Sequence, residues 1–299
     1  MRVARSVLVA ALTFSAAAVG AQMASAQKFE PVAPPPVAFG APPAGATDKI
    51  DPGLRQTADL LGILRGGNQA AGNVNILEYN AHGVVTDWET AGAKEAVVDN
   101  YTFNVSVFDN ASRVSFQGAN TPLTIRVVKG TRAWDEAWSK DNKLTTKPAD
   151  ANVAARRAMM WLEPHAIIHV AIYAANGKCP DNKDCKDLPM PKVTQDGGKS
   201  VINVTVEGNV YKVTLGPDQR PARVETTQGG HTYAANYFGY RNGTSLGQEA
   251  LDKMHNGTYW PSRVTQEVDG KKVVDVIVSA GWSNPYSIYP DPEVLAKAQ

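Results

Sequence analysis

The sequence contains very little cysteine: two residues, Cys179 and Cys185, among 299. So small a number excludes a scaffold stapled by several disulfides and a zinc site made from two cysteine pairs. The pair also lacks the two-residue spacing that is typical of redox and zinc motifs. A metal or redox role is therefore the weaker interpretation. In an oxidising compartment, a pair this close in sequence is most simply a disulfide that closes a small loop, and this is our prediction.

The chain also lacks a surplus of charge of either sign, with 30 Lys and Arg against 29 Asp and Glu. Loss of residues 1–26, which hold Arg2 and Arg5 and no acidic residue, leaves 28 basic against 29 acidic residues and a net charge of −1. Proteins that bind nucleic acid or an anionic membrane surface usually carry a basic surplus. We therefore expect neither as a partner.

Long apolar runs are scarce, and the first lies at the N-terminus. Two arginines precede an apolar run from Val7 to Val19, and an Ala-Ser-Ala site ends at Ala26. This is the pattern of a bacterial secretory signal peptide, residues 1–26, so we expect a periplasmic or secreted protein without a transmembrane span in the mature chain. Residues 27–47 hold six prolines among Ala and Gly, which indicates a disordered linker.

The most apolar segment of the mature chain, Val153–Gly177, is predicted to form two helices separated by a proline. Asp150 and Asn152 are expected to cap the first helix with their side-chain oxygens. That helix should end near Glu163, because Pro164 cannot stand inside a helix without losing a hydrogen bond and clashing with the preceding turn.

The second helix should run from Pro164 to a stop at Gly177. Its faces are apolar except for one line of side chains, His165, His169 and Tyr173. A helix of this kind must be covered by other structure, and about twelve residues are too few to cross a bilayer. We therefore expect the helical pair to be the buried centre of the fold.

The rest of the chain contains one more helix and a series of strands. The helix should begin at Asp51-Pro52 and end at Gly66-Gly67, with Leu54, Ala58, Leu61 and Leu64 on its buried stripe. Elsewhere apolar and polar residues alternate, as they do in half-buried antiparallel strands. The predicted strands are 73–79, 101–109, 113–117, 123–129, 200–207, 210–215, 222–227, 231–238, 264–268 and 273–278.

These elements predict an α+β, mainly-β fold, in which one curved antiparallel sheet surrounds two or three helices. Gly208-Asn209, Gly229-Gly230 and Asp269-Gly270 are the expected turns of hairpins in the second half. We expect a single domain over residues 48–285 and a C-terminal tail over residues 286–299.

Short motifs spread over about residues 50–285 carry a resemblance to a known family. They are Val128–Trp134 (VKGTRAW), Arg156-Arg157, Trp161–His165 (WLEPH), Pro221–Thr226, Tyr233–Tyr240, Trp260–Arg263 and Lys272–Val278. Together they resemble the β-rich module that precedes the metallo-β-lactamase-fold domain in secreted bacterial proteins. That module is similar to the half-barrel superfamily of periplasmic lipoprotein carriers, so the resemblance implies a curved half-barrel whose concave apolar face holds the helices.

The chain departs from this module in two ways. It ends at Gln299 without the metallo-β-lactamase domain, and the His-x-His-x-Asp-His signature of that domain is absent, so we do not expect zinc hydrolysis. It also inserts residues 243–257 where the module has a shorter link.

Two patterns raise the alternative of a hydrolase. His165 and His169 stand four residues apart on one helix, a spacing that can bring two imidazoles to one metal ion, but Ala166 replaces the glutamate of the zincin motif and no third ligand is indicated. Residues 243–247 (GTSLG) fit a nucleophile elbow around Ser245, but the preceding strand belongs to an antiparallel meander rather than a parallel sheet. We interpret the histidines as core residues and expect no metal and no cofactor.

Aromatic and methionine side chains near the helical pair provide candidates for an apolar binding site, with a filled core as the alternative. We predict a non-catalytic periplasmic binding or carrier module for a hydrophobic or lipid-like molecule. The alternatives are a structural or docking module for a separately encoded hydrolase in the periplasm, and a serine or metal-dependent hydrolase. The predicted ligand-binding residues are Trp134, Trp138, Met160, Trp161, His165, His169 and Tyr173.

Overall fold

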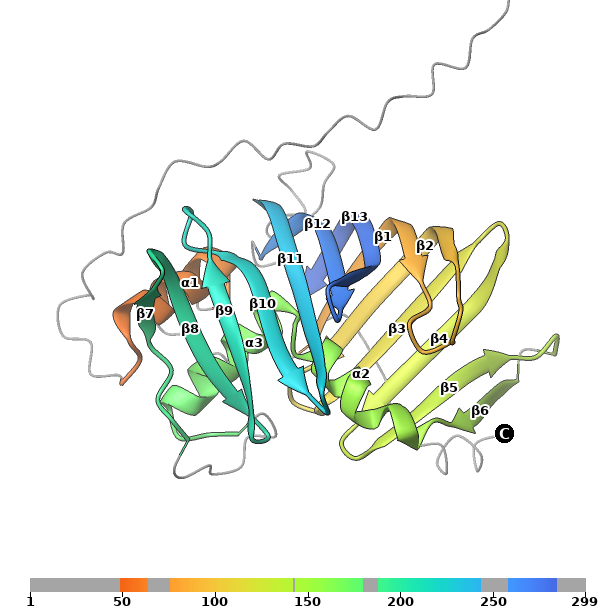
Figure 1. Cartoon of the computed structure of the whole chain (residues 1–299), viewed down its shortest axis with the longest axis horizontal. Coiled ribbons are helices and arrows are strands. Elements are labelled where there is room, and N and C mark those ends of the chain that lie inside the picture. The colour runs from red at the N-terminus through yellow and green to blue at the C-terminus, as the bar shows by residue number, and fades with distance from the viewer. Residues whose placement is uncertain (1–48, 64–75, 142, 180–187, 243–257, 284–299) are drawn as a thin grey trace, which may run out of the picture. The chain divides into compact units, whose positions relative to one another are not determined.

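One antiparallel sheet dominates the part of the chain that the computed structural model describes, residues 49–63, 76–141, 143–179, 188–242 and 258–283 (Figure 1). Within these ranges there are thirteen strands and three α-helices. The helices are α1 (Pro52–Leu61), α2 (Val153–Met160) and α3 (Pro164–Ala175), and a short 3-10 helix, Asp150–Asn152, leads into α2. The strands are β1 (Ile76–Thr86), β2 (Glu95–Ser106), β3 (Ala111–Gly118), β4 (Thr121–Lys129), β5 (Arg132–Trp138), β6 (Leu144–Pro148), β7 (Val193–Asp196), β8 (Lys199–Val206), β9 (Asn209–Leu215), β10 (Pro221–Gln228), β11 (His231–Asn242), β12 (Tyr259–Val268) and β13 (Lys271–Ser283).

The sheet consists of two meanders that meet at its centre. Strands β1 to β6 follow one another on one side, β7 to β13 follow one another on the other, and β1 pairs with β13, where Val84 lies opposite Asp275. The edge strands β6 and β7 do not pair with each other, so the sheet is open, and it is not strongly curled. The predicted mainly-β, antiparallel class is confirmed.

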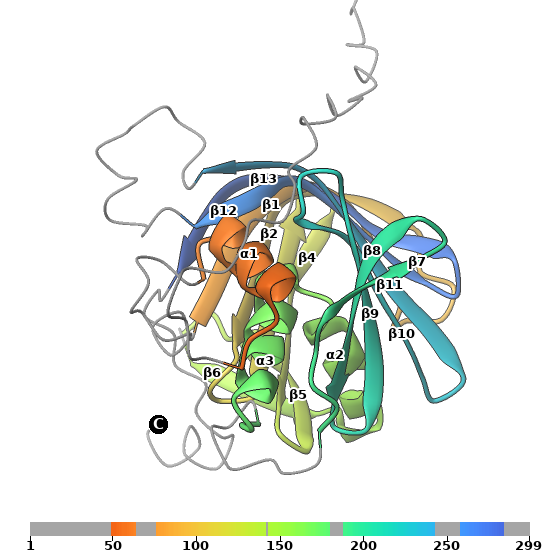
Figure 2. The same cartoon turned by 90° about the vertical axis from the view of Figure 1, so that its left-hand side faces the viewer.

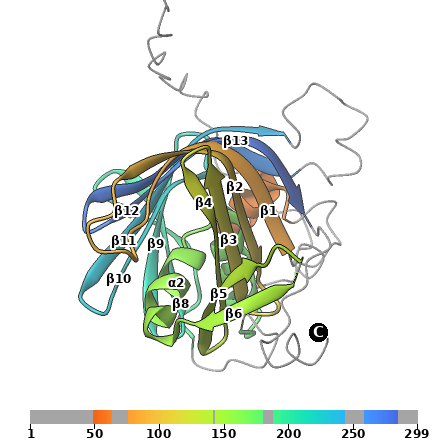
Figure 3. The same cartoon turned by 90° about the vertical axis from the view of Figure 1, so that its right-hand side faces the viewer.

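All three helices lie on the same face of the sheet (Figure 2). Helix α1 packs against α3, and α3 contacts β8. Helix α2 contacts β3, β4 and β5 of the first meander and β10 and β11 of the second, so it joins the two halves of the sheet (Figure 3). None of the described helices is long and apolar enough to span a membrane.

The start of α1 agrees with the prediction, but its end does not. The Asp51 carboxylate accepts hydrogen bonds from the backbone N–H groups of Gly53 and Leu54, both at 3.0 Å, and Pro52 occupies the first turn. The helix ends at Leu61 because Gly62 adopts a left-handed conformation with φ of 80° and turns the chain. The predicted stop at Gly66-Gly67, together with Leu64, lies outside the described residues.

The break at Pro164 is confirmed, but the predicted side-chain caps of α2 do not form. The N-cap of α3 is Glu163, whose carboxylate accepts a 2.6 Å hydrogen bond from the Ala166 N–H. Asp150 does not cap α2, because its Oδ1 accepts from the Ala133 N–H of β5 at 3.1 Å. Asn152 does stand at the N-cap position of α2, but its side chain makes no capping hydrogen bond, and its amide donates to the Glu89 carboxylate at 2.7 Å. The predicted N-cap position at Asn152 is confirmed, but the predicted capping by the side-chain oxygens of Asp150 and Asn152 was wrong, because both side chains bind partners elsewhere in the fold.

Three described strands were not predicted: β5, β6 and β7. Strand β6 reads Leu-Thr-Thr-Lys-Pro and lies at the edge of the sheet, where backbone pairing with β5 holds it without burial of alternate side chains. It therefore lacks the apolar alternation by which a strand is recognised. Strand β1 continues to Thr86 rather than stopping at Tyr79, and residues 73–75 of the predicted strand lie outside the described part.

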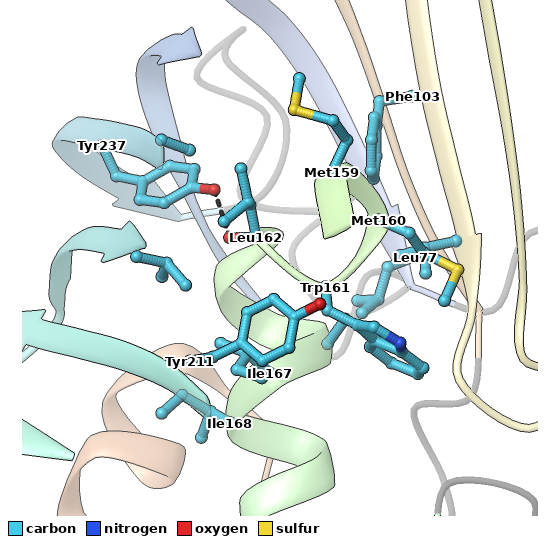
Figure 4. Packing of buried hydrophobic residues seen from close by; sticks show 14 of the residues in the cluster. Leu77, Phe103, Met159, Met160, Trp161, Leu162, Ile167, Ile168, Tyr211 and Tyr237 are labelled. Carbon is cyan, nitrogen blue, oxygen red and sulfur yellow. Dashed lines mark hydrogen bonds between the residues drawn. The ribbon is translucent and has the colours of Figure 1, made fainter. Parts of the chain in front are cut away.

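The helical pair occupies the centre of the core, as predicted. Every residue of α3 is buried, and Ile167, Ile168 and Ile172 are at most 1% exposed. Figure 4 shows Trp161 and two of these isoleucines, Ile167 and Ile168, packed between side chains of the two meanders, with Leu77 on one side and Tyr211 on the other. This packing fixes α2 and α3 against the sheet and so positions the side chains described next.

Candidate functional site

The candidate site is a pocket between α2 and the sheet, partly open to solvent, with a volume of about 50 Å³. That volume holds roughly four water molecules. Its lining comes from β1 to β4, β12, β13 and α2, and from the loop of residues 87–94 between β1 and β2, which we call the β1–β2 loop. The lining residues include Glu89, Tyr101, Phe103, Val114, Phe116, Arg126, Arg156, Met159 and Met160.

Aromatic side chains from neighbouring strands form the apolar wall of the pocket. Tyr101 and Phe103 lie two residues apart on β2 and therefore point to the same face of the sheet. Phe116 of β3 lies opposite Tyr101 in the sheet register. The Tyr79 ring stacks on Phe103, with a centroid distance of 5.4 Å. Burial raises the pKa of Tyr101 well above its ordinary value, so its hydroxyl stays uncharged.

Two methionines complete the wall from the helix side. Met159 and Met160 are the last two residues of α2, and they are 7% and 0% exposed. Figure 4 shows Met159 and Met160 beside Phe103. Because a methionine side chain is unbranched and polarisable, it can adjust to an apolar guest more easily than a branched side chain can.

One side of the pocket is lined by a buried arginine, Arg156 of α2, which is 5% exposed. Its guanidinium forms a two-bond pair with Glu89, at 2.8 Å from Nε and 2.6 Å from Nη2. Nη2 also donates to Asp135 at 2.5 Å, and Nη1 donates to the carbonyls of Val127 and Trp134 at 3.1 and 2.8 Å. Burial lowers the pKa of Arg156, but the two carboxylates outweigh burial and raise it above its ordinary value.

Arg126 of β4 stands next to this pair and shares Glu89, with 3.4 Å between Arg126 Nε and Glu89 Oε2. Its Nη2 also binds Asp87 of the β1–β2 loop. We call Arg126, Arg156, Asp87, Glu89 and Asp135 the arginine cluster. The cluster contains two positive and three negative side chains, so its net charge is −1. It ties the β1–β2 loop to both β4 and α2.

Because Asp87 of the β1–β2 loop binds Arg126, we expect the stability that this contact contributes to decrease in acid. Burial acts to raise the pKa of Asp87, but hydrogen bonds from Arg126 and Thr90 outweigh burial and hold the pKa below its ordinary value. Stabilisation from Asp87 is therefore complete above about pH 4, the unfolded pKa, and is lost as the pH falls through the lowered folded pKa.

We expect Asp87→Asn to reduce the free energy of unfolding by at most about 1 kcal/mol at pH 6, since Asp87 is only partly buried. The difference between the two proteins should shrink towards zero at the lowest pH at which both still fold. Urea unfolding at several pH values measures this, and a difference that stays constant with pH would contradict the prediction.

The histidines of α3 are buried in the core and do not line this pocket. His165 is fully buried, its Nδ1 lies 2.7 Å from Glu163 Oε1, and its Nε2 lies 2.7 Å from the carbonyl oxygen of Tyr259. The ring of His169 packs against Tyr173 at a centroid distance of 4.6 Å. Among the described residues, no group of three or more His, Cys, Asp or Glu side chains is arranged to hold a metal ion.

The structure does not bring the seven predicted ligand-binding residues together. Met160 lines the pocket, whereas Trp161, His165, His169 and Tyr173 pack in the core around α3. Trp134 lies on the opposite face of the sheet, with Ala111, Ile125 and Val127. Trp138 is 53% exposed on β5.

Sequence reasoning missed the residues that form most of this pocket. The alternation of Tyr101 and Phe103 was recognised as a strand pattern, but it does not show which helix covers that face. A stronger signal was Arg156, a charged residue on an apolar helix that is expected to be buried. Such a side chain needs acidic partners, and these come from the β1–β2 loop and β5.

Two predictions lie outside the described residues. Cys185 belongs to residues 180–187 and Ser245 to residues 243–257, so the disulfide and the elbow stay predictions. The strand that precedes the elbow, β11, is antiparallel to both of its neighbours, as its place in a meander predicts.

No model of a known protein family matches the chain, and a search of curated proteins found no match. The resemblance to the β-rich module and to the lipoprotein carriers therefore stays a prediction, and the proposal below depends on the geometry of the pocket.

Proposed function

We propose that the protein is a non-catalytic periplasmic or secreted binding module, and that the pocket beside α2 takes the end of a hydrophobic or lipid-like molecule. The predicted half-barrel, a sheet curved around its helices, belongs to this proposal. The observation that supports it best is the combination of an aromatic wall, two methionines and a partial opening to solvent in one pocket. Small-molecule sites commonly combine a mostly apolar lining with a few polar groups.

The volume of the pocket limits what it can hold. A space of about 50 Å³ admits a chain end rather than a whole lipid. Four buried methylene groups contribute about 3 kcal/mol, which alone corresponds to an affinity weaker than millimolar. Tighter binding therefore requires the pocket to widen, and Met159 and Met160 are the side chains best suited to move.

Binding of 1-octanol, observed through ¹³C-labelled methionine methyl groups by NMR, tests the proposal. We expect saturable shifts of the Met159 and Met160 methyl signals in the purified protein. A Val114→Trp variant should abolish these shifts, because Val114 lines the pocket and the larger ring fills it.

The matched control is Val97→Trp on β2, since Val97 is 69% exposed and does not line the pocket. This variant should bind octanol as the unaltered protein does. If no saturable shift occurs in the unaltered protein, or if Val114→Trp and Val97→Trp behave alike, the pocket is not a binding site.

Docking of a protein partner is the second candidate function. Trp138 is 53% exposed on β5, next to the edge strand β6, and exposed tryptophan is more common at protein interfaces than elsewhere on a surface. Capture of a periplasmic protein that is lost in a Trp138→Ser variant, but retained in Val114→Trp, would favour this function over the first.

A further inference from the structure

The charges in the pocket wall bear on the polarity of the ligand. Arg126 and Arg156 are the cationic side chains that line the pocket. An unmatched arginine in an apolar pocket would be a natural partner for a carboxylate or phosphate group. Whether these two arginines are matched therefore decides whether an anionic ligand gains anything by entering.

Every N–H donor of the Arg156 guanidinium already has an acceptor within the protein. Nε and Nη2 bind Glu89 and Asp135, and Nη1 binds two backbone carbonyls of β4 and β5. A ligand carboxylate could reach this guanidinium only by displacing Glu89. Glu89 would then lose a two-bond ion pair while its side chain is only 6% exposed, and a buried carboxylate without its partner is strongly unfavourable.

The charge of Arg126 is matched by Asp87, which its Nη2 binds, and by Glu89, whose Oε2 lies 3.4 Å from Arg126 Nε. Its guanidinium also lies over the ring of Phe116, 5.7 Å from the centroid, which places it along the apolar wall. With Asp135 included, the arginine cluster carries a net charge of −1. Because both arginines that line the pocket already have carboxylate partners and the cluster as a whole is not cationic, we expect no net attraction of a second anion, and the apolar lining does not solvate one.

We propose, on the basis of the binding function above, that the pocket accepts the uncharged end of an apolar molecule, such as a hydrocarbon chain, an alcohol or an ester, and discriminates against a carboxylate of the same chain length. The arginine cluster serves to hold the β1–β2 loop over the pocket rather than to bind the head group of an anionic lipid.

A comparison of 1-octanol with octanoate at pH 8 tests this ligand class, with the methionine methyl signals as the readout. We expect the dissociation constant of octanoate to be at least tenfold higher than that of octanol. Added salt should narrow this ratio, because salt screens the repulsion between the carboxylate and the cluster.

A Glu89→Gln variant makes the test specific to the cluster. It removes one of the three carboxylate charges, so the ratio of the octanoate and octanol dissociation constants should fall at least fivefold. The matched control is Glu225→Gln, which removes a partly exposed carboxylate paired with Arg223 on β10, and it should keep the ratio of the unaltered protein. Should Glu89→Gln not fold, Asp135→Asn removes a more exposed carboxylate of the same cluster.

The outcomes separate the two proposals. If neither compound binds, the proposed function fails. If octanoate binds as tightly as octanol, or more tightly, the binding function stands and the inference about ligand charge is wrong. If Glu89→Gln and Asp135→Asn both fold and leave the ratio unchanged, the cluster is not the source of the selectivity and the inference is likewise overturned.

Discussion

Replacing Arg156 with alanine is expected to lower the free energy of unfolding by about 3–5 kcal/mol, since removing one partner of a buried ion pair leaves an uncompensated charge. The charge left behind is that of Glu89, whose side chain is 6% exposed. The carbonyls of Val127 and Trp134 lose a donor in the same step. Urea unfolding of the variant measures the loss.

Two further variants identify the cause of the loss. The double variant Arg156→Met with Glu89→Gln removes both charges and keeps an apolar side chain in place, so it should be more stable than Arg156→Ala. Arg223→Ala breaks a pair with Glu225 in which both side chains are 33% exposed, and it should cost no more than about 1 kcal/mol. A loss for Arg156→Ala as small as that for Arg223→Ala would show that the arginine cluster contributes little to stability.

The elements that could be predicted from the sequence are those with local signals. Pro164 separates two helices because a proline ring excludes a helix interior whatever the rest of the fold does. Gly229-Gly230 and Asp269-Gly270 form hairpin turns with positive φ at all four residues, as their composition indicates. Strands β8 to β13 lie in the expected order for the same reason, since each pairs with its neighbour in sequence.

The turn between β8 and β9 shows how a distant contact changes a local outcome. The sequence predicts Gly208-Asn209 as the turn, but the left-handed residues are Glu207 and Gly208, with φ of 53° and 80°, and β9 begins at Asn209. This conformation is less favourable for Glu than for Gly or Asn. The Glu207 carboxylate accepts a 2.9 Å hydrogen bond from Asn110 and pairs with Arg157. These two contacts hold the turn of the second meander against Asn110 of the first meander and against Arg157 of α2.

The location of the pocket could not be predicted, because it depends on pairings that span long stretches of chain. Glu89 and Arg156 are 67 positions apart, and nothing near either residue indicates the other. Trp134 was assigned to the site because it is aromatic, and aromatic side chains often line apolar pockets. The structure places it on the other face of the sheet, which only the register of β5 against β4 determines.

The second large effect is expected from Gly281→Ala on β13, where a glycine makes room for a buried ring. A Cβ atom at this position would lie 2.3 Å from the Trp260 ring, closer than two carbon atoms can approach. The ring cannot easily move away, because it is 1% exposed and packs against His165 at 4.4 Å and Tyr79 at 6.3 Å. We expect a loss of about 3 kcal/mol, at the upper end for overpacking in a core.

A double-mutant cycle tests whether the clash with Trp260 is the cause. In a Trp260→Leu background the methyl group of Gly281→Ala enters space that the indole has left, so the two losses should not add, and the coupling should exceed about 1 kcal/mol. Gly92→Ala is the control for the loss of a glycine as such, since no atom would approach its Cβ within 4 Å, although its φ of 72° disfavours alanine. That change should cost about 1 kcal/mol. Additive losses in the cycle, or a Gly281→Ala protein as stable as the Gly92→Ala protein, would mean that the ring does relax, and that the contact between β12, β13 and α3 is looser than its burial indicates.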